Sequence, residues 1–389
     1  MRTLALALAA SAVLAAPLAA DNDVELSAED LLAPYYSKLQ QEIELPVAPE
    51  GVSLPHNHTI TRIAFGSCNH QLRSQHMWGQ IAATSPDIFL FIGDNNYGDQ
   101  MWDGDAALTT LRQAYAVQAE TPELAEFRAQ VPMMITWDDH DYGFNDGGAS
   151  FAYRSWSETI FETFWGSSDD VKSRPGIYES RMFGEDGKVT QIITLDTRFF
   201  RSDLETMPYQ NERPPLGPYQ PSSDPSKTML GDAQWQWLEQ ELAKPADLRI
   251  VVSSIQVITD AHDYEAWENL PLEREKLYAM LGAREDSGLV LLSGDRHAGG
   301  IYTEAPEAAG EQLWELTSSS MNYSFSSTER NTAREPDPKR LTDFISEENF
   351  GMVEIDWSAR TLTMSLRGAG SVRDGSGAGD VRVTRTVSW

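Results

Sequence analysis

Short apolar runs that end abruptly in polar or ionisable residues recur along the chain. Each run has the length of a strand, is rich in β-branched and aromatic residues, and lacks clean alternation. This pattern is typical of strands that are buried on both faces. It predicts six such strands: Arg62–Cys68, Asp87–Asp94, Met133–His140, Val189–Arg198, Leu248–Gln256 and Gly288–His297.

Helical spacing of apolar residues separates several of these runs. The predicted helices are Ala106–Gln118, Thr121–Ala129, Phe151–Trp165, Ala233–Ala243 and Leu272–Leu281, after an earlier helical stretch at Leu31–Leu45. The alternation of strands and helices predicts a layered α/β fold. Near the C-terminus we expect a hairpin, Phe350–Trp357 with Thr361–Arg367, and a further strand, Val381–Val387.

Ionisable residues gather where the predicted strands end. They are Cys68, Asp94, Asp138-Asp139-His140, Asp196-Thr197-Arg198 and Asp295-Arg296-His297. In open α/β sheets, ligands bind beyond the carboxyl ends of the strands. Any one of these groups suits a turn or a cap, but their repetition at successive strand ends predicts a functional site.

The chain divides into three parts. Residues 1–20 are a run of Leu, Ala and Val after Arg2 and end in small residues, which is typical of a cleavable secretory signal peptide. A membrane anchor is the alternative, but the run is shorter than a bilayer span requires. Residues 21–59 are an acidic, proline-punctuated lead-in segment, and residues 60–389 form the main domain. We therefore expect a periplasmic or secreted protein without a membrane span.

Charge limits the choice of partners. The 389 residues include 30 Lys and Arg against 59 Asp and Glu, a formal charge of -29. Such a surface repels phosphate backbones and anionic lipids, so the protein is not expected to coat nucleic acid or membranes. Cys68 is the one cysteine in the sequence, which excludes an intrachain disulfide. The oligomeric state is left open.

Residues 202–231 interrupt the pattern with six prolines. A long stretch of this kind inside a compact domain is usually either a functional lid or an irregular, disordered loop. The sequence leaves both interpretations open.

Asp94 lies in the polar turn Gly93–Asp99, which reads GDNNYGD. A carboxylate on such a turn can bridge two metal ions, and Asn95 and Tyr97 are plausible co-ligands. The alternative is an aspartate that only stabilises the turn.

Further strand ends add possible metal ligands. Asp138, Asp139 and Asp141 flank His140, and such a cluster is electrostatically costly unless a cation offsets it. In an extended backbone, Asp295 and His297 would face the same way and hold one ion. Cys68 is either a small buried hydrophobe or, as a thiolate, another metal ligand.

Together these residues meet the needs of a two-metal site that hydrolyses phosphate esters. Such a site requires a bridging carboxylate, several ligands, a histidine near the reacting oxygens, and cations for the other phosphate oxygens. His140 is the candidate histidine. Arg198, Arg201 and Arg296 are candidate cations, although Arg198 equally suits an ion pair with Asp196.

The motifs, in their order, resemble those of the alkaline phosphatase D family of PhoD-like metallophosphatases. They are Gly66–Asn69 (GSCN), Gly93–Asp99 (GDNNYGD), Thr136–Asp141 (TWDDHD), Leu195–Arg198 (LDTR), Ser253–Gln256 (SSIQ) and Leu292–His297 (LSGDRH). The resemblance implies a four-layer α-β-β-α metallophosphoesterase sandwich of two mixed sheets flanked by helices.

The resemblance also implies roles for individual residues. The site would hold Fe(III) with Ca²⁺, or another dinuclear metal pair. By motif position, Cys68 and Tyr97 would bind iron and Asp94 would bridge the two metals. Asp139, Asp295 and His297 would be further ligands, with Asp138 as the alternative to Asp139. His140 would lie at the phosphate.

The predicted function is that of an exported, metal-dependent phosphoric ester hydrolase acting on a small-molecule phosphate ester. A metal-activated hydroxide would attack a phosphomonoester or a phosphodiester. One alternative is a phosphodiesterase or phospholipase that takes a larger substrate. Another is a non-catalytic protein that binds metal or phosphate.

Overall fold

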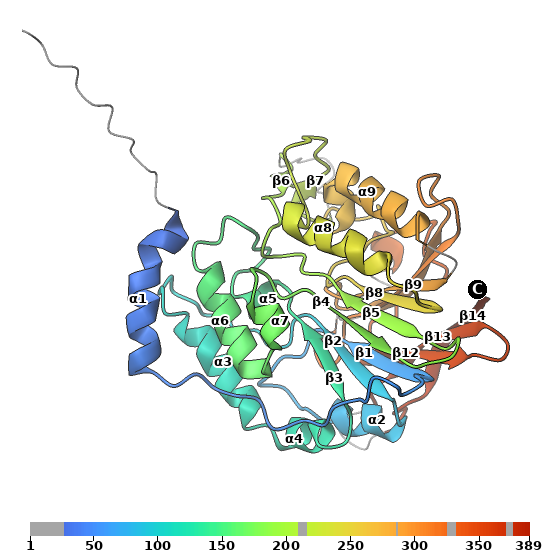
Figure 1. Ribbon diagram of the computed structural model, residues 1–389, viewed down its shortest axis with the longest axis horizontal. Coiled ribbons are helices and arrows are strands. Elements are labelled where there is room, and N and C mark those ends of the chain that lie inside the picture. Colours follow the sequence, from blue (N-terminus) through green and yellow to red (C-terminus); the bar gives the residue numbers. More distant parts are fainter. Residues whose placement is uncertain (1–26, 209–215, 285–286, 325–331, 371–375) are drawn as a thin grey trace, which may run out of the picture.

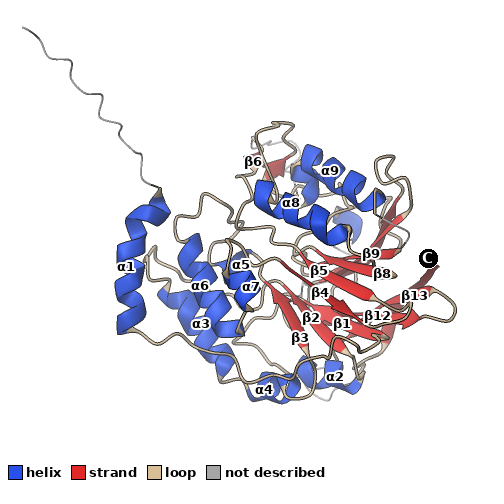
Figure 2. Cartoon of the chain, in the orientation of Figure 1, coloured by secondary structure: helices blue, strands red, loops and turns tan. Residues whose placement is uncertain are grey.

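Two six-stranded mixed sheets lie face to face, with helices outside them (Figures 1 and 2). The computed structural model describes residues 27–208, 216–284, 287–324, 332–370 and 376–389. The four-layer α-β-β-α sandwich expected from the motifs is thereby confirmed. The predicted signal peptide, residues 1–20, lies outside the described residues.

The first sheet, sheet A, has the strand order β14-β13-β12-β1-β2-β3. Its strands are β1 (Arg62–Gly66), β2 (Ile88–Ile92), β3 (Met133–Thr136), β12 (Asn349–Asp356), β13 (Thr361–Gly368) and β14 (Val381–Ser388). The first three are parallel, and the last three form an antiparallel meander that joins the sheet beside β1. The predicted C-terminal hairpin and the strand after it are confirmed.

The second sheet, sheet B, has the strand order β10-β11-β9-β8-β5-β4. Its strands are β4 (Glu179–Phe183), β5 (Thr190–Thr194), β8 (Leu248–Val252), β9 (Gly288–Ser293), β10 (Gly299–Glu304) and β11 (Leu313–Ser318). The inner four are parallel, and β4 and β10 pair antiparallel at the edges. The sequence analysis missed β4, β10 and β11. In β4, which reads ESRMF, four of the five residues are only partly buried, so no apolar run marks it.

Helices cover the outer faces of both sheets and were predicted in large part. Beside sheet A lie α2 (Met77–Ala83), α3 (Thr109–Ala119), α4 (Pro122–Arg128) and α6 (Arg154–Trp165), and beside sheet B lie α8 (Gly231–Leu242) and α9 (Pro271–Gly282). Shorter elements are α5 (Asp139–Tyr142), α7 (Asp169–Lys172), the 3-10 turn η1 (Trp267–Asn269), and the ribbon β6 (Glu205–Thr206) with β7 (Tyr219–Gln220). The β6–β7 ribbon gives part of the proline-rich stretch a regular structure, while residues 209–215 lie outside the description.

The absence of polar alternation in the strands follows from the layers. In β2, Ile88, Leu90 and Ile92 pack between the two sheets, whereas Phe89 and Phe91 pack against the helices of sheet A. Each buried side chain of this size stabilises the fold by about 1.5–3 kcal/mol. Both faces of the strand are therefore apolar, and the first polar side chains come where the strand leaves the core.

The lead-in segment packs along the helical side of sheet A. Its helix α1 (Ala28–Glu42) begins with a reciprocal cap between Ser27 and Asp30, which satisfies the first free N–H groups. Tyr36 of this helix stacks on Trp156 of α6, with ring centroids 5.1 Å apart. Among the described residues, no helix has the length and apolar character needed to cross a membrane.

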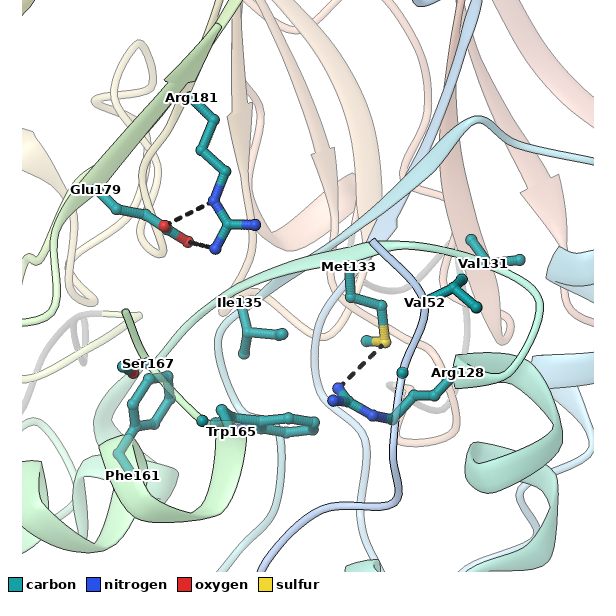
Figure 3. A pocket seen from close by; sticks show the side chains of 12 residues that line it. Val52, Arg128, Val131, Met133, Ile135, Phe161, Trp165, Ser167, Glu179 and Arg181 are labelled. Atoms are coloured by element: carbon teal, nitrogen blue, oxygen red, sulfur yellow. Dashed lines mark hydrogen bonds and ion pairs between the residues drawn. The ribbon is translucent and has the colours of Figure 1, made fainter. Parts of the chain in front are cut away.

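A pocket of about 170 Å³ separates the lead-in segment from the outer strands β3 and β4 (Figure 3). Arg128 extends into this region, where its Nε donates to the Pro49 carbonyl and its guanidinium lies over Trp165. Across the pocket, Arg181 pairs with Glu179. None of the residues that the sequence assigns to chemistry lines this pocket, so we attribute it to packing of the lead-in segment.

Candidate metal centre

The predicted site residues meet where the strand ends of the two sheets converge. Cys68 follows β1, Asp94 follows β2, Asp138 and Asp139 follow β3, and Asp295 and His297 follow β9. Two glycines allow this close approach. A Cβ on Gly93 would lie 2.6 Å from the Cβ of Asp138, and one on Gly294 would lie 2.4 Å from the Ser67 hydroxyl.

Four of the predicted metal ligands have left-handed backbone conformations. The φ angles are 58° at Cys68, 45° at Asp94, 69° at Asp295 and 51° at His297. The prediction of an extended backbone at Asp295 and His297 is therefore wrong, although both side chains still reach the same region. Left-handed residues other than glycine are uncommon and concentrate at functional sites.

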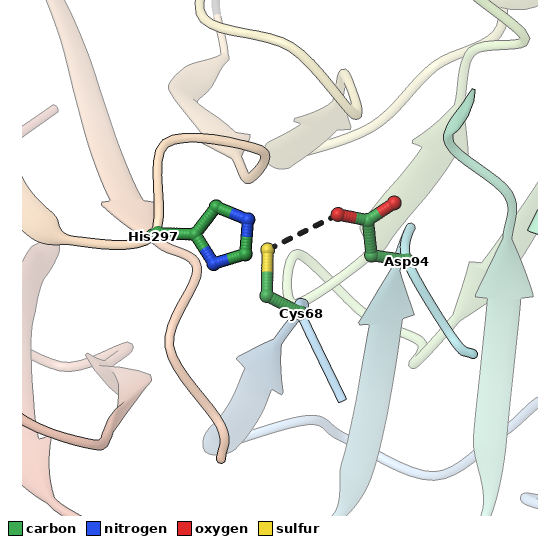
Figure 4. A group of neighbouring side chains, drawn as sticks. All are labelled: Cys68, Asp94 and His297. Atoms are coloured by element: carbon green, nitrogen blue, oxygen red, sulfur yellow. Dashed lines mark hydrogen bonds between the residues drawn. The ribbon is translucent and has the colours of Figure 1, made fainter. Parts of the chain in front are cut away.

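One group of side chains centres on the Asp94 carboxylate. Cys68 Sγ and Tyr97 Oη each donate a hydrogen bond of 3.2 Å to Asp94 Oδ2. Tyr97 Oη also lies 3.3 Å from His297 Nε2. Figure 4 shows Cys68, Asp94 and His297 pointing toward one another from three separate chain segments. One ligand atom from each of these three lies within 4.8 Å of the others. A thiol, a phenol, a carboxylate and an imidazole therefore surround one small volume.

Four carboxylates meet on the other side of Asp94. One oxygen each of Asp94, Asp138, Asp139 and Asp295 lies within 4.8 Å of the others. The Oδ1 atom of Asp94 and the Oδ2 atom of Asp138 are buried and have no hydrogen-bond partner in the described part of the chain. Unpartnered buried carboxylate oxygens are costly unless a cation binds them.

The protein's own charges make this arrangement unfavourable. Burial, with the charges of Asp139 and Asp138, raises the pKa of Asp94 well above its ordinary value against the opposing effect of His140. Burial and the same two aspartates raise the pKa of Asp295 as well. Burial also raises the pKa values of the Cys68 thiol and the Tyr97 phenol. A bound cation reverses each effect, because it stabilises the deprotonated ligands. The donor set therefore fits a metal centre, and we call Cys68, Asp94, Tyr97, Asp295 and His297 the open cluster.

A second acidic group lies beside the open cluster and contains its own cations. Arg198 Nε lies 2.6 Å from Asp138 Oδ1, and Arg198 Nη1 lies 2.5 Å from Glu265 Oε2. Arg201 Nη2 lies 2.6 Å from Glu265 Oε1. All four side chains are buried. We call them the arginine-paired cluster. The suggested ion pair between Arg198 and the Asp196 carboxylate does not form, since only the Arg198 backbone N–H binds Asp196.

Asp138 and Asp139 differ in the hydrogen bonds that their carboxylate oxygens accept. Asp138 Oδ1 accepts from Arg198 and Ser254, while its Oδ2 is unpartnered, and burial raises its pKa to about 6 despite the nearby arginine. Asp139 accepts backbone N–H donors on both oxygens. Burial would raise its pKa, but the charges of His140 and Arg198 hold it well below the ordinary value. Both lie within reach of Asp94, so the assignment between them stays open.

His140 is held by a carboxylate that the sequence analysis did not select. Its Nδ1 lies 2.7 Å from Asp99 Oδ1, and its ring packs on Tyr97 with centroids 4.2 Å apart. Burial would lower the pKa of His140, but the charges of Asp139, Asp94 and Asp99 raise it to about 11. These carboxylates therefore favour the protonated form of the imidazole, which lies directly beside the open cluster.

The remaining predicted residues lie nearby with different partners. The Asn95 amide donates to the Thr136 carbonyl, and its buried Oδ1 has no partner in the described chain. Arg296 does not present a free charge, because its Nη2 pairs with Glu335 Oε2 at 2.5 Å and its guanidinium lies over the Tyr264 ring. All three candidate cations, Arg198, Arg201 and Arg296, are thus buried and paired with carboxylates within the protein.

Several side chains at the centre were missed from the sequence. Asp99, Asp146, Glu265 and Tyr323 all contact predicted site residues or complete an acidic group with them. Asp99 lies in the GDNNYGD turn and could have been found there. Glu265 and Tyr323 do not directly follow any of the predicted strands, and no sequence signal that we recognise places them at the site.

Two facing mixed sheets, flanked by helices and with candidate metal ligands at their shared strand ends, place the chain in the class of metallophosphoesterase-like folds. Comparison with known proteins identifies the family. The family model described as PhoD-like phosphatase matches residues 63–146 and 166–366. The chain therefore belongs to the PhoD-like phosphatase family, and the resemblance inferred from the motifs is confirmed.

Two related proteins are similar to this chain. Alkaline phosphatase D of Bacillus subtilis (strain 168) is 22% identical over an alignment of 302 residues, which covers 68% of this chain and 51% of that protein. The chain thus spans about half the length of this curated relative. A solved structure described as "Structure of PhoD" has a TM-score of 0.66 at 18% identity, over 88% of this chain and 71% of that chain. This second likeness shows a shared fold.

Proposed function

We propose that this protein is an exported, metal-dependent phosphoric ester hydrolase with a dinuclear metal centre. The observation that carries the proposal is the unpartnered Asp94 Oδ1 inside a group of four carboxylates, three of them buried and the fourth, Asp295, partly buried. Family membership supports the phosphatase activity, and the pattern of residues 1–20 supports export.

In this proposal Asp94 would be shared by the two ions. Cys68, Tyr97 and His297 would hold one of them, for which Fe(III) suits the tyrosinate and the carboxylates. Asp138 or Asp139, with Asn95, would hold the other, for which oxygen ligands suit Ca²⁺. Asp295 would be a further ligand. When bound, such a pair supplies an activated water and stabilises charge on the phosphoryl oxygens.

The chain's own residues supply the proton chemistry. Asp99 binds His140 Nδ1, which fixes the ring and leaves Nε2 to donate a proton toward the leaving oxygen. Arg198 acts as a positioning residue, because it holds Asp138 by one oxygen and leaves the other oxygen free. Arg296 likewise orients the turn that carries Asp295 and His297 by its pair with Glu335.

The function is tested with one phosphomonoester and one phosphodiester of the same chromophore. Turnover is measured from pH 6 to pH 10, with Fe(III) and Ca²⁺ and after chelation. We expect turnover that chelation removes, and the ratio of the two rates distinguishes a phosphomonoesterase from a diesterase or phospholipase-type enzyme. Metal binding without turnover of either ester would instead favour the non-catalytic binding protein.

His140→Ala tests the catalytic assignment. General acid catalysis contributes about 10²–10⁴-fold, so turnover should fall by that factor while the metal content stays unchanged. Loss of metal in parallel with turnover would show that His140 supports the centre instead of the proton transfer. Metal content and turnover should be measured on the same preparation.

A further inference from the structure

The three buried arginines do not offer free positive charge to a substrate. Arg198, Arg201 and Arg296 are all paired with carboxylates inside the protein. The chain as a whole carries a formal charge of -29. An enzyme this acidic needs a local cation if its substrate carries negative charge beyond the reacting phosphate.

Arg73 is a cation of this kind at the edge of the centre. It lies in the loop after β1, five residues beyond Cys68, and its side chain is exposed. It forms no ion pair with any carboxylate in the described part of the chain, whereas Arg198, Arg201 and Arg296 all do. Its charge is therefore available to a ligand.

The Arg73 guanidinium is held in place although it is exposed. It lies 4.0 Å from the centroid of the Tyr323 ring, and its Nη1 donates to the Asn322 carbonyl over 3.2 Å. Asn322 is itself anchored, because its amide donates to Asn69, His70 and Ser74. A cation–π contact of this type fixes the plane of the guanidinium.

Tyr323 connects this cation to the open cluster. Its ring lies 4.7 Å from the His297 ring and 5.0 Å from the Tyr97 ring, measured between centroids. Its carbonyl oxygen lies 2.5 Å from His297 Nδ1. Arg73 is thus separated from two candidate metal ligands by the width of one aromatic ring.

The geometry leaves one edge of the guanidinium open. Nη1 binds Asn322, and the N–H groups on the Nε–Nη2 edge have no acceptor in the described chain. Two parallel N–H groups on one edge match both oxygens of a carboxylate or a phosphate.

We propose that Arg73, seated on Tyr323, is a specificity-determining residue that binds a second anionic group of the substrate. The favoured substrates are then phosphoric esters whose organic part carries a carboxylate or a further phosphate close to the scissile phosphate. This inference rests on the proposed hydrolase function and names the substrate class of the same site.

Two matched substrates test this inference: 4-carboxyphenyl phosphate and its neutral analogue 4-carbamoylphenyl phosphate. Arg73→Gln removes the charge that binds the second anion, so it should lower kcat/KM for the carboxylate substrate by about fivefold, the upper range for an exposed ion pair. The amide substrate should change by less than about twofold, because it offers no charge to Arg73. Arg73→Lys keeps the charge without the two-pronged edge and should give an intermediate loss for the carboxylate substrate.

Arg385→Gln is the matched control. Arg385 lies on the outer strand β14 and contacts an aromatic ring, Trp314, at 5.2 Å. It should leave both substrates unaffected. An equal loss for both substrates in Arg73→Gln, or no loss for either, would overturn the inference while the hydrolase function stands. If the metal-loaded wild-type enzyme hydrolysed neither ester nor the chromogenic esters, the proposed function would fail, and the inference with it.

Discussion

The open cluster and the arginine-paired cluster are both buried and acidic, yet they balance their charge in opposite ways. In the arginine-paired cluster, Arg198 and Arg201 neutralise Asp138 and Glu265 within the protein. In the open cluster, Asp94 keeps an unpartnered oxygen, and burial with like charges raises the pKa values of Asp94 and Asp295. Acidic side chains alone therefore do not mark a metal site. The informative feature is a buried carboxylate oxygen, Asp94 Oδ1, that has no hydrogen-bond partner in the described chain.

Asp138 lies on the boundary between the two clusters. One of its oxygens binds Arg198 and the other faces the carboxylates around Asp94. A single side chain thus links a region whose charges the protein pairs by itself to the region that we propose binds metal ions. Substitutions on the two sides of this boundary should have opposite effects on metal binding and on folding.

Asp94→Asn should have the largest effect on activity. Loss of the shared ligand should remove several kcal/mol of transition-state stabilisation, which corresponds to about 10³-fold or more in turnover. The metal-free variant should be at least as stable as the metal-free wild type, because one member of a like-charged group is gone. Turnover, metal content and the Tm of the chelated protein check this. A large fall in Tm without metal would place Asp94 among the structural residues.

Arg198→Met should have the largest effect on folding. The substitution leaves Asp138 and Glu265 buried without their shared cation, which costs about 3–5 kcal/mol of unfolding free energy. Denaturant unfolding of the metal-free protein measures this directly. A stability change below about 1 kcal/mol, the range of an exposed ion pair, would contradict the role given to the arginine-paired cluster.

Cys68→Ser should weaken the binding of one metal ion more than the binding of the other. Loss of this ligand should reduce iron affinity by about 10- to 100-fold, the range found for altered metal surroundings, and leave Ca²⁺ affinity nearly unchanged. Metal analysis after dialysis against a graded chelator checks the difference. Unchanged iron content would return Cys68 to the alternative of a small buried hydrophobe.

Glu158→Gln should have a small effect on stability, and the size of this effect should depend on pH. Burial and the charges of Glu162 and Asp196 raise the pKa of Glu158 to about 8. The folded state therefore holds this proton more tightly than the unfolded state does. Its contribution to stability is complete below the unfolded pKa of 4.5 and is lost as the pH rises through about 8. Tm measured from pH 5 to pH 9 should fall less steeply in the variant, and identical slopes would exclude Glu158 as the source.

Much of the fold could be predicted from the sequence, because buried parallel strands such as Ile88–Ile92 leave an unmistakable apolar run. The half-buried edge strand Glu179–Phe183 leaves no such run and was missed. The convergence of the candidate ligands was also predictable, since they follow those apolar runs directly. The residues that contact these candidate ligands and their arginines could not be predicted. Glu265 and Tyr323 come from loops far along the chain, and only the folded structure brings Glu265 to Arg198 and Tyr323 to His297.

The arginines show the same limit. A sequence indicates where a cation lies along the chain but not which carboxylate lies against it. Arg198 and Arg296 occupy motif positions, which makes them candidates for phosphate binding. In the structure, however, both guanidinium groups form ion pairs with glutamates from distant loops. Arg73 occupies none of the matched motifs and carries the exposed charge beside the open cluster.

The most direct test of this account is the metal content of purified wild-type protein beside that of Asp94→Asn and Asp196→Asn. Asp196 is as deeply buried as Asp94, but its carboxylate is fully satisfied by N–H donors such as those of Trp137, Phe199 and Ile177. We predict bound metal ions in the wild type and in Asp196→Asn, and loss of metal in Asp94→Asn. Equal metal content in all three proteins, or none in a wild-type protein that hydrolyses esters in the presence of chelator, would contradict the assignment of the open cluster as the metal centre.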